Sequence, residues 1–230
     1  MKTLLMGGQA CVFYGAAEFS RDLDLLILSD AGNIAAFHKA LADLKAESIA
    51  VPPFDSGWLA KGHALHFRCH RPHVEGLRID VMALYRGGAP FNELWQRRTT
   101  IEVDGESIDL LSLPDLVTAK KTQRDKDWPM IGRLVERFYF ENSASPSEGQ
   151  IEFLLNELRT PVLLMELTRT RPDAAMFARS RRQAVAAALS GNEDAVRAAI
   201  ELEEQAERNK DREFWQPLKR ELEELRHRRK

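Results

Sequence analysis

The sequence predicts a mixed α/β fold followed by an all-helical region. In its first half, short apolar runs of strand length alternate with amphipathic helical patterns. In its second half, only helical periodicity and helix-capping residues occur. We therefore expect a mixed sheet flanked by helices in residues 1–125 and an all-helical domain in residues 126–230.

The expected strands are short apolar or alternating runs bounded by turn-forming residues. They lie at 3–6, 23–28, 63–70, 77–82, 101–103 and 107–110. Asp104-Gly105 joins the last two, which is a hairpin signal. Helices are expected at 9–17 and at 33–47, where apolar residues recur at spacings of three and four.

Capping residues divide the helical half. Ser112 and Ser145 each precede an acidic residue by three positions, which fits a capping box, and Pro146 suits a first helical position. Gly191-Asn192 separates a helix ending near residue 189 from one beginning at 193. In the last helix the apolar residues form a single stripe: Phe214, Leu218, Leu222 and Leu225.

Composition excludes several classes of protein. Hydrophobic residues make up 44% of the 230, enough for a core, and the net charge of −2 excludes a globally basic nucleic-acid wrapper. Cys11 and Cys69 are the only cysteines, which indicates a reducing compartment. Because no apolar run reaches the length of a membrane helix, we expect a cytoplasmic protein without membrane association.

Three aspartates interrupt apolar strands. Asp22 and Asp24 are two residues apart, so they share one strand face, and Asp80 lies between Ile79 and Val81. Converging carboxylates repel each other unless a cation lies between them, and their hard oxygen atoms favour magnesium or manganese. The alternative is that each aspartate marks a strand end and faces solvent.

A glycine pair precedes these carboxylates. Gly7-Gly8 follows the apolar run at 3–6, and such a pair opening a helix can present backbone N–H groups to a phosphate. The order of this turn, Asp22-Leu23-Asp24 and a later Asp80 resembles the signature of the nucleotidyltransferase superfamily related to DNA polymerase beta. The resemblance implies that the mixed sheet is nucleotidyltransferase-like.

Further residues resemble the AbiEii-like abortive-infection toxin branch of that superfamily, over residues 4–135. They are Gly7-Gly8-Gln9-Ala10, Tyr14-Gly15, Arg21-Asp22-Leu23-Asp24-Leu25, and the group Lys120, Arg124, Lys126 and Asp127. Ser20-Arg21 departs from the branch, which more often has Arg-x-Thr/Ser there.

The resemblance implies an enzyme that transfers a nucleoside monophosphate from an NTP such as ATP to an acceptor hydroxyl on RNA, a tRNA end or a protein. It assigns catalysis and the binding of Mg²⁺ or Mn²⁺ to Asp22, Asp24 and Asp80. It assigns nucleotide binding to Gly7, Gly8, Arg21, Lys120 and Arg124. The alternatives are a catalytically inactive nucleotide- or RNA-binding module of a two-protein system, and a toxin that modifies tRNA ends.

An arginine-rich segment favours a solvated helix face, with a contact to RNA or another polyanion as the functional alternative. It contains Arg169, Arg171, Arg179, Arg181 and Arg182. The C-terminal helices are the expected surface for an antitoxin partner or for homo-oligomerisation.

A histidine cluster allows a second metal hypothesis. His63, His66, His70 and His73 surround Cys69, but their spacing is not that of a zinc finger. Over zinc, the sequence favours a polar strand face formed by His66, Arg68 and His70 near the nucleotide cleft, which could bind phosphate or acceptor, and a purely structural role is an equal alternative. A glycosidase pair formed by Glu18 with Asp22 or Asp24 is disfavoured, and neither a P-loop nor a Gly-x-Ser-x-Gly elbow occurs.

Overall fold

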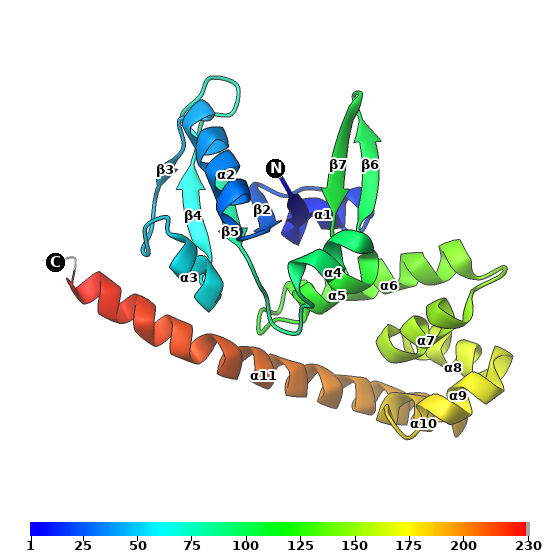
Figure 1. Ribbon diagram of the computed structural model, residues 1–230. Helices are drawn as coiled ribbons and strands as arrows, with labels where there is room; N and C mark the ends of the chain where they lie inside the picture. Colours follow the sequence, from blue (N-terminus) through cyan, green and yellow to red (C-terminus); the bar gives the residue numbers. More distant parts are fainter. Residues whose placement is uncertain (229–230) are drawn as a thin grey trace. The chain divides into compact units, whose positions relative to one another are not determined.

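The computed structural model describes residues 1–228, and the chain divides into two compact units (Figure 1). The first unit comprises Met1–Lys120 together with the chain from Arg212 onward. The second unit comprises Lys121–Asp211.

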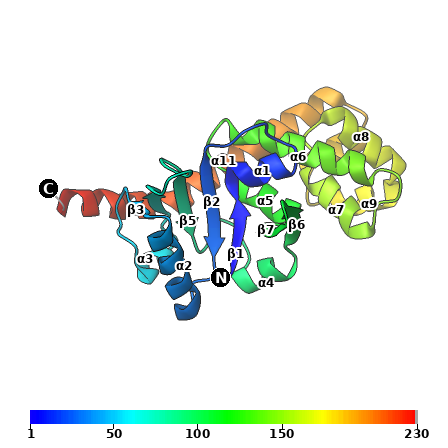
Figure 2. The same cartoon turned by 90° about the horizontal axis from the view of Figure 1, so that it is seen from above.

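A seven-stranded mixed sheet forms the centre of the first unit, in the order β3-β4-β5-β2-β1-β7-β6. The strands are β1 Thr3–Met6, β2 Asp22–Ile27, β3 Glu47–Ser48, β4 Leu65–Arg68, β5 Arg78–Met82, β6 Thr99–Val103 and β7 Glu106–Leu110. β2 lies between an antiparallel neighbour, β1, and a parallel neighbour, β5 (Figure 2). The prediction of a mixed sheet flanked by helices and followed by a helical region is confirmed.

Five helices accompany this sheet in Met1–Lys120. They are α1 Gly7–Phe13, α2 Ala31–Asp43, α3 Ser56–Lys61, α4 Phe91–Gln96 and α5 Leu113–Lys120. The helix expected at 9–17 is thus shorter and begins directly after β1, because Gly7 adopts a φ of +67° at the turn. Asp30 caps α2 by accepting a hydrogen bond from the Asn33 backbone N–H at 2.8 Å.

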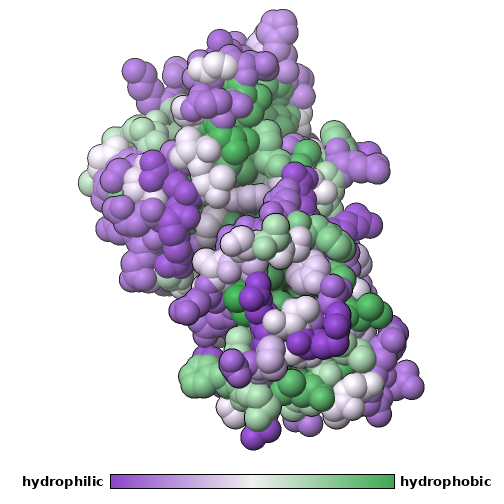
Figure 3. All heavy atoms as spheres, turned by 90° about the vertical axis from the view of Figure 1, so that its right-hand side faces the viewer, coloured by the Kyte–Doolittle hydropathy of each residue, from purple (hydrophilic) through white to green (hydrophobic). Residues whose placement is uncertain are grey.

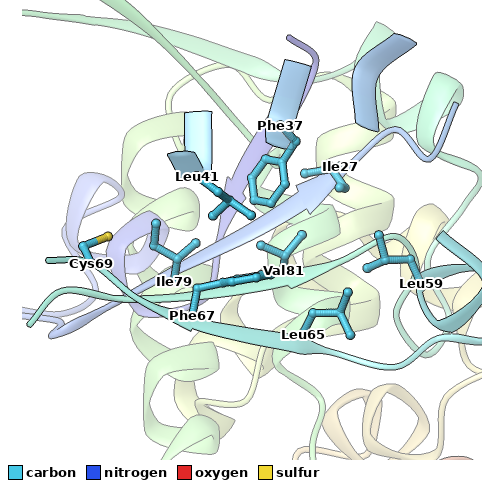
Figure 4. Close-up of a cluster of buried hydrophobic side chains, with 9 residues drawn as sticks. All are labelled: Ile27, Phe37, Leu41, Leu59, Leu65, Phe67, Cys69, Ile79 and Val81. Atoms are coloured by element: carbon cyan, nitrogen blue, oxygen red, sulfur yellow. The ribbon is translucent and has the colours of Figure 1, made fainter. Parts of the chain in front are cut away.

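One hydrophobic cluster joins α2 and α3 to the sheet. Figure 4 shows Phe37 and Leu41 of α2 facing the apolar side chains of β4 and β5, among them Phe67, Ile79 and Val81. All five side chains are buried. The part of this sheet face that carries Ile79 and Val81 is therefore buried.

The alternation of β2 directs its aspartates away from this cluster. Leu23 and Leu25 pack against the cluster. Because successive side chains of a strand point to opposite faces, Asp22 and Asp24 project from the other face. The core thus determines which face of the sheet carries the carboxylates.

The predicted hairpin at 101–110 is confirmed. β6 and β7 pair antiparallel from Thr99 and Leu110 to Val103 and Glu106. Asp104 and Gly105 both have positive φ, at 52° and 82°. This is the backbone that a two-residue hairpin turn requires, and aspartate and glycine tolerate it best.

The second unit is helical. Its elements are α6 Asp127–Asn142, α7 Glu148–Glu157, α8 Pro161–Thr170, α9 Pro172–Ala178, α10 Gln183–Leu189 and the first part of α11 Glu193–Arg228. The capping box predicted at Ser145 is wrong, because Ser147 caps α7. The Ser147 hydroxyl accepts from the Gln150 backbone N–H, and the Gln150 side-chain oxygen accepts from the Ser147 backbone N–H. The predicted break at Gly191-Asn192 is confirmed.

The last helix contributes to both units, which differs from the expected domains 1–125 and 126–230. Its residues from Arg212 onward group with the sheet. The reason is a set of contacts in which Glu221 binds Lys61 at 2.5 Å and His63 at 2.6 Å. These contacts join a helical stretch to residues some 160 positions earlier, and helical periodicity does not report such partners.

Among the described residues, no helix is both long enough and apolar enough to cross a membrane. The face shown in Figure 3 is largely hydrophilic, with hydrophobic side chains scattered across it. Exposed apolar side chains of the second unit include Val162, Met176, Phe177 and Leu202.

Candidate functional site

Pairing between β2 and β5 gathers the three predicted carboxylates. Asp24 and Asp80 are register partners on these parallel strands, and Asp22 is the partner of Arg78. Register partners point to the same face of a sheet, and so do residues two apart on one strand. Asp22, Asp24 and Asp80 therefore project from the face opposite the hydrophobic cluster.

The glycine turn lies directly against Asp24. Met6 is the register partner of Asp24, so Gly7 follows at the level of this carboxylate. A Cβ built on Gly7 would overlap the Asp24 side chain, and the Gly8 backbone N–H donates to Asp24 Oδ2 at 3.4 Å. Gly7 is thus required twice, by its positive φ and by the space that Asp24 occupies.

The loop before β2 lies against the second glycine. A Cβ on Gly8 would overlap the hydroxyl of Ser20. The Ser20 hydroxyl donates to the Asp22 carbonyl at 3.3 Å, while the Gln9 amide donates to the Ser20 carbonyl at 2.8 Å. These contacts connect the glycine turn with the start of β2.

Asp80 is bound by Arg78, which sequence reasoning did not assign to the site, and by His66, which it placed on a strand face near the nucleotide cleft. Arg78 donates from Nε to Oδ1 at 2.7 Å and from Nη2 to Oδ2 at 3.0 Å. His66 of β4 lies opposite Asp80 in register, with Nδ1 2.8 Å from Oδ1. The available signal was alternation, since Arg78 is two residues before Asp80 and therefore on its face.

The contacts among Asp80, Arg78 and His66 shift the pKa values of Asp80 and Arg78. Burial alone would raise the pKa of Asp80, but the hydrogen bonds from His66 and Arg78 outweigh it and lower that pKa below its ordinary value. The hydrogen bond to Asp80, with the nearby charges of Asp22 and Asp24, raises the pKa of Arg78. Arg78 is thus a counter-cation for all three carboxylates.

The donor set suits a hard divalent cation, and Arg78 already engages the Asp80 carboxylate. Three carboxylates on one sheet face supply the oxygen ligands that magnesium and manganese prefer. Within residues 1–228, no group of three histidine, cysteine, aspartate or glutamate side chains is already arranged to hold a metal ion. Arg78 donates to both carboxylate oxygens of Asp80. The three carboxylates therefore fit a metal ion if the metal replaces Arg78 at Asp80.

The other predicted nucleotide contacts lie in different places. Arg21 is exposed immediately before β2, and Lys120 is buried at the end of α5 in the sheet unit. Arg124 belongs to the helical unit, where its Nε donates to the buried carboxylate of Asp127 at 2.7 Å. The nucleotide roles of these three residues remain predictions.

The histidines do not act together. His63 is buried against Glu221, His66 binds Asp80, and His70 lies 3.0 Å from Glu75. Only His66 lies within strand β4. Each of these three histidines thus has its own carboxylate partner, which argues against a shared zinc site. The strand-face interpretation applies to His66, the one of the three that lies in β4.

The arginine segment is not one solvated face. Arg182 is only 6% exposed, and it donates to the carbonyls of Leu155 and Leu158. Arg181 is exposed and pairs with Glu152 at 3.2 Å. The solvated-face interpretation is therefore wrong for Arg182, whose guanidinium is committed to the interior of the helical unit, and the RNA contact of the segment stays a prediction.

A search of solved structures finds a likeness to an antigenic nucleotidyltransferase-like protein from Paracoccidioides brasiliensis. The two chains are 18% identical, the match covers 76% of this chain and 83% of that chain, and the TM-score is 0.40. No protein-family model matches the chain, and no curated protein matches it. The function proposed below therefore rests on the glycine turn and the carboxylates themselves.

Proposed function

We propose that the sheet unit is a metal-dependent nucleotidyltransferase. The observation that supports it is the close approach of the Gly7-Gly8 backbone to Asp24, beside Asp22 and Asp80 on the same sheet face. A turn without side chains lets a polyphosphate approach the backbone closely, and carboxylates beside it can share a divalent cation with that polyphosphate.

In the proposed reaction an acceptor hydroxyl attacks the α-phosphorus of an NTP. The new bond joins the acceptor oxygen to this phosphorus, and the bond to the oxygen bridging the α- and β-phosphates breaks. Pyrophosphate leaves with the electron pair, and the hydroxyl proton passes to a base or to water. Asp22 and Asp24 would hold magnesium or manganese, which when bound neutralises phosphate charge.

The other residues have distinct proposed roles. Gly7 and Gly8 leave room for the triphosphate, and Arg21 and Lys120 supply positive charge toward it. Because its pKa is lowered, Asp80 is ionised at neutral pH and is a weak base. We therefore assign Asp80 to orienting the acceptor hydroxyl and completing the metal site once Arg78 releases it.

The same contact favours a second candidate, a nucleotide-binding module that does not transfer. Arg78 and His66 together engage the Asp80 carboxylate, so the third acidic position is already neutralised by the protein. If Arg78 keeps this position with nucleotide bound, an NTP and a cation would bind at Asp22 and Asp24 without reaction.

Calorimetric titration and a transfer assay separate these candidates. We expect NTP to bind in the presence of magnesium and only weakly in the presence of EDTA. Asp24→Asn should remove this binding, whereas the control Asp43→Asn, at an exposed position, should retain it. Transfer is measured as pyrophosphate released and as label from an α-³²P NTP on RNA or protein. Binding with transfer supports the enzyme and binding without transfer the module, whereas magnesium-independent binding that survives Asp24→Asn contradicts both.

A further inference from the structure

A cavity in the helical unit is lined by cationic side chains and is separate from the sheet face described above. Its volume is about 480 Å³. The charged residues that line it are Lys121, Arg159, Arg179, Arg181, Arg182, Lys210, Glu203 and Glu207. All of them belong to Lys121–Asp211, so one compact unit builds the whole cavity.

Arg159 is the most informative of these residues. Its Nε and Nη1 atoms are buried, and neither has a hydrogen-bond partner among the described residues. Its guanidinium carbon lies 4.5 Å from the ring centroid of Trp128, a buried residue whose indole N–H donates to the Thr122 carbonyl at 2.9 Å. Two buried donor atoms without an acceptor are costly, so a ligand that accepts from this guanidinium would be stabilising.

The surrounding charges show what kind of ligand fits. Four of the six cations have a carboxylate within ion-pair distance: Lys121 with Glu157, Arg181 with Glu152, Arg182 with Glu203, and Lys210 with Glu207. Over residues 1–228, Arg159 and Arg179 have no such partner, and the only side-chain hydrogen bond of Arg179 runs to the sulfur of Met176. The cavity therefore carries two positive charges that no carboxylate binds.

Neighbouring groups do not remove this excess. Glu157 lies near Arg159, but it accepts from Lys121 through Oε1 and its Oε2 is itself buried without a partner. Burial and the adjacent positive charge of Arg182 lower the pKa of Arg159, while Glu157, Glu203 and Glu204 only partly oppose this. An anion in the cavity would relieve both unfavourable effects on the Arg159 guanidinium.

We propose that this cavity binds one dianionic phosphate group, either inorganic phosphate or the phosphate of an organic monoester. Two guanidinium groups without carboxylate partners match two negative charges, and guanidinium groups pair well with phosphate oxygens. Arg159 supplies the buried donors and the exposed Arg179 supplies a second cation. Arg182 is not assigned to the phosphate, because its donors are already used on Glu203 and on two main-chain carbonyls.

Calorimetric titration of the full chain tests this site with three probes. We expect inorganic phosphate and phenyl phosphate to bind at neutral pH, and dimethyl phosphate, a monoanionic diester, to bind at least about tenfold more weakly because it brings one charge fewer. Tighter binding of phenyl phosphate would indicate an organic monoester as the source, and tighter binding of inorganic phosphate the free ion. Equal binding of dimethyl phosphate overturns the proposal, and so does absence of binding by the other two.

Variants locate the binding. We expect Arg159→Met to weaken phosphate binding by about tenfold or more, the effect of removing a charged hydrogen-bond donor. Arg179→Met should also weaken phosphate binding. Because Arg179 is exposed, this variant tests the site even if Arg159→Met does not fold. Arg197→Met is the matched control, because Arg197 carries the same charge in the same unit but pairs with Glu193. Unchanged binding in both Arg159→Met and Arg179→Met, or equal weakening in Arg197→Met, overturns the proposal.

Discussion

Arg78 binds both carboxylate oxygens of Asp80 from two residues away on the same strand, at 2.7 and 3.0 Å. The pair lies on the sheet face that also carries Asp22 and Asp24. A side chain of the protein thus supplies the positive charge that three neighbouring carboxylates need. The proposed metal competes with Arg78 for Asp80.

Replacing Arg78 should expose this competition. We expect Arg78→Gln to lower the free energy of unfolding by about 1–2 kcal/mol without metal, because Asp80 loses a charged partner beside two like charges. Magnesium should stabilise this variant more than the wild type. The measurement is urea denaturation with and without magnesium, and Arg71→Gln, at an exposed position of the same unit beyond the end of β4, is the control. Equal magnesium effects on both variants would contradict the competition.

The lowered pKa of Asp80 gives a signed pH dependence. The stabilisation from its pairing should be fully present above the unfolded pKa of about 3.9 and should disappear as the pH falls through the lower folded value. Asp80→Asn should therefore flatten the acid side of a stability curve measured by urea denaturation between about pH 5 and 2. Asp43→Asn is the exposed control, and an identical acid dependence in Asp80→Asn and wild type would refute the assignment.

The glycine turn should not accept a side chain. We expect Gly7→Ala to cost at least about 1–3 kcal/mol, because its positive φ is strained for alanine and the new Cβ would displace Asp24. Gly132→Ala is the contrasting control, since a Cβ there meets nothing within 4 Å and alanine favours the helix by about 0.5–1 kcal/mol. Thermal or urea unfolding measures both, and a tolerated Gly7→Ala would show that the turn has room.

The end of α11 should stabilise the sheet unit. His63 is 1% exposed and lies 2.6 Å from Glu221, so Glu221→Ala leaves a buried imidazole without its partner. We expect a loss of about 1–3 kcal/mol in urea denaturation. Glu223→Ala, exposed on the same helix, should change the free energy of unfolding by less than about 0.5 kcal/mol. Equal losses in the two variants would mean that the Glu221 contact contributes nothing.

Much of the local structure, and the candidate carboxylates, could be predicted from neighbouring residues alone, whereas the cap of α7 and the short elements β3, α3 and α4 could not. Short apolar runs interrupted by aspartates located β2 and β5, and the spacing of Asp22 and Asp24 placed both on one strand face. Asp104-Gly105 predicted its hairpin because only a few residue types adopt positive φ at low cost. These are properties of neighbouring residues, so periodicity and turn chemistry reveal them.

The contacts between distant residues could not be predicted from the sequence. The tertiary structure paired Asp24 with Asp80, engaged Asp80 with Arg78 and His66, and brought Glu221 to His63. It also buried Arg182 and left the donors of Arg159 without acceptors inside a cavity. Such contacts depend on strand order and helix packing, which bring together residues far apart in the chain, and no local pattern records the burial or the partner of a charged side chain.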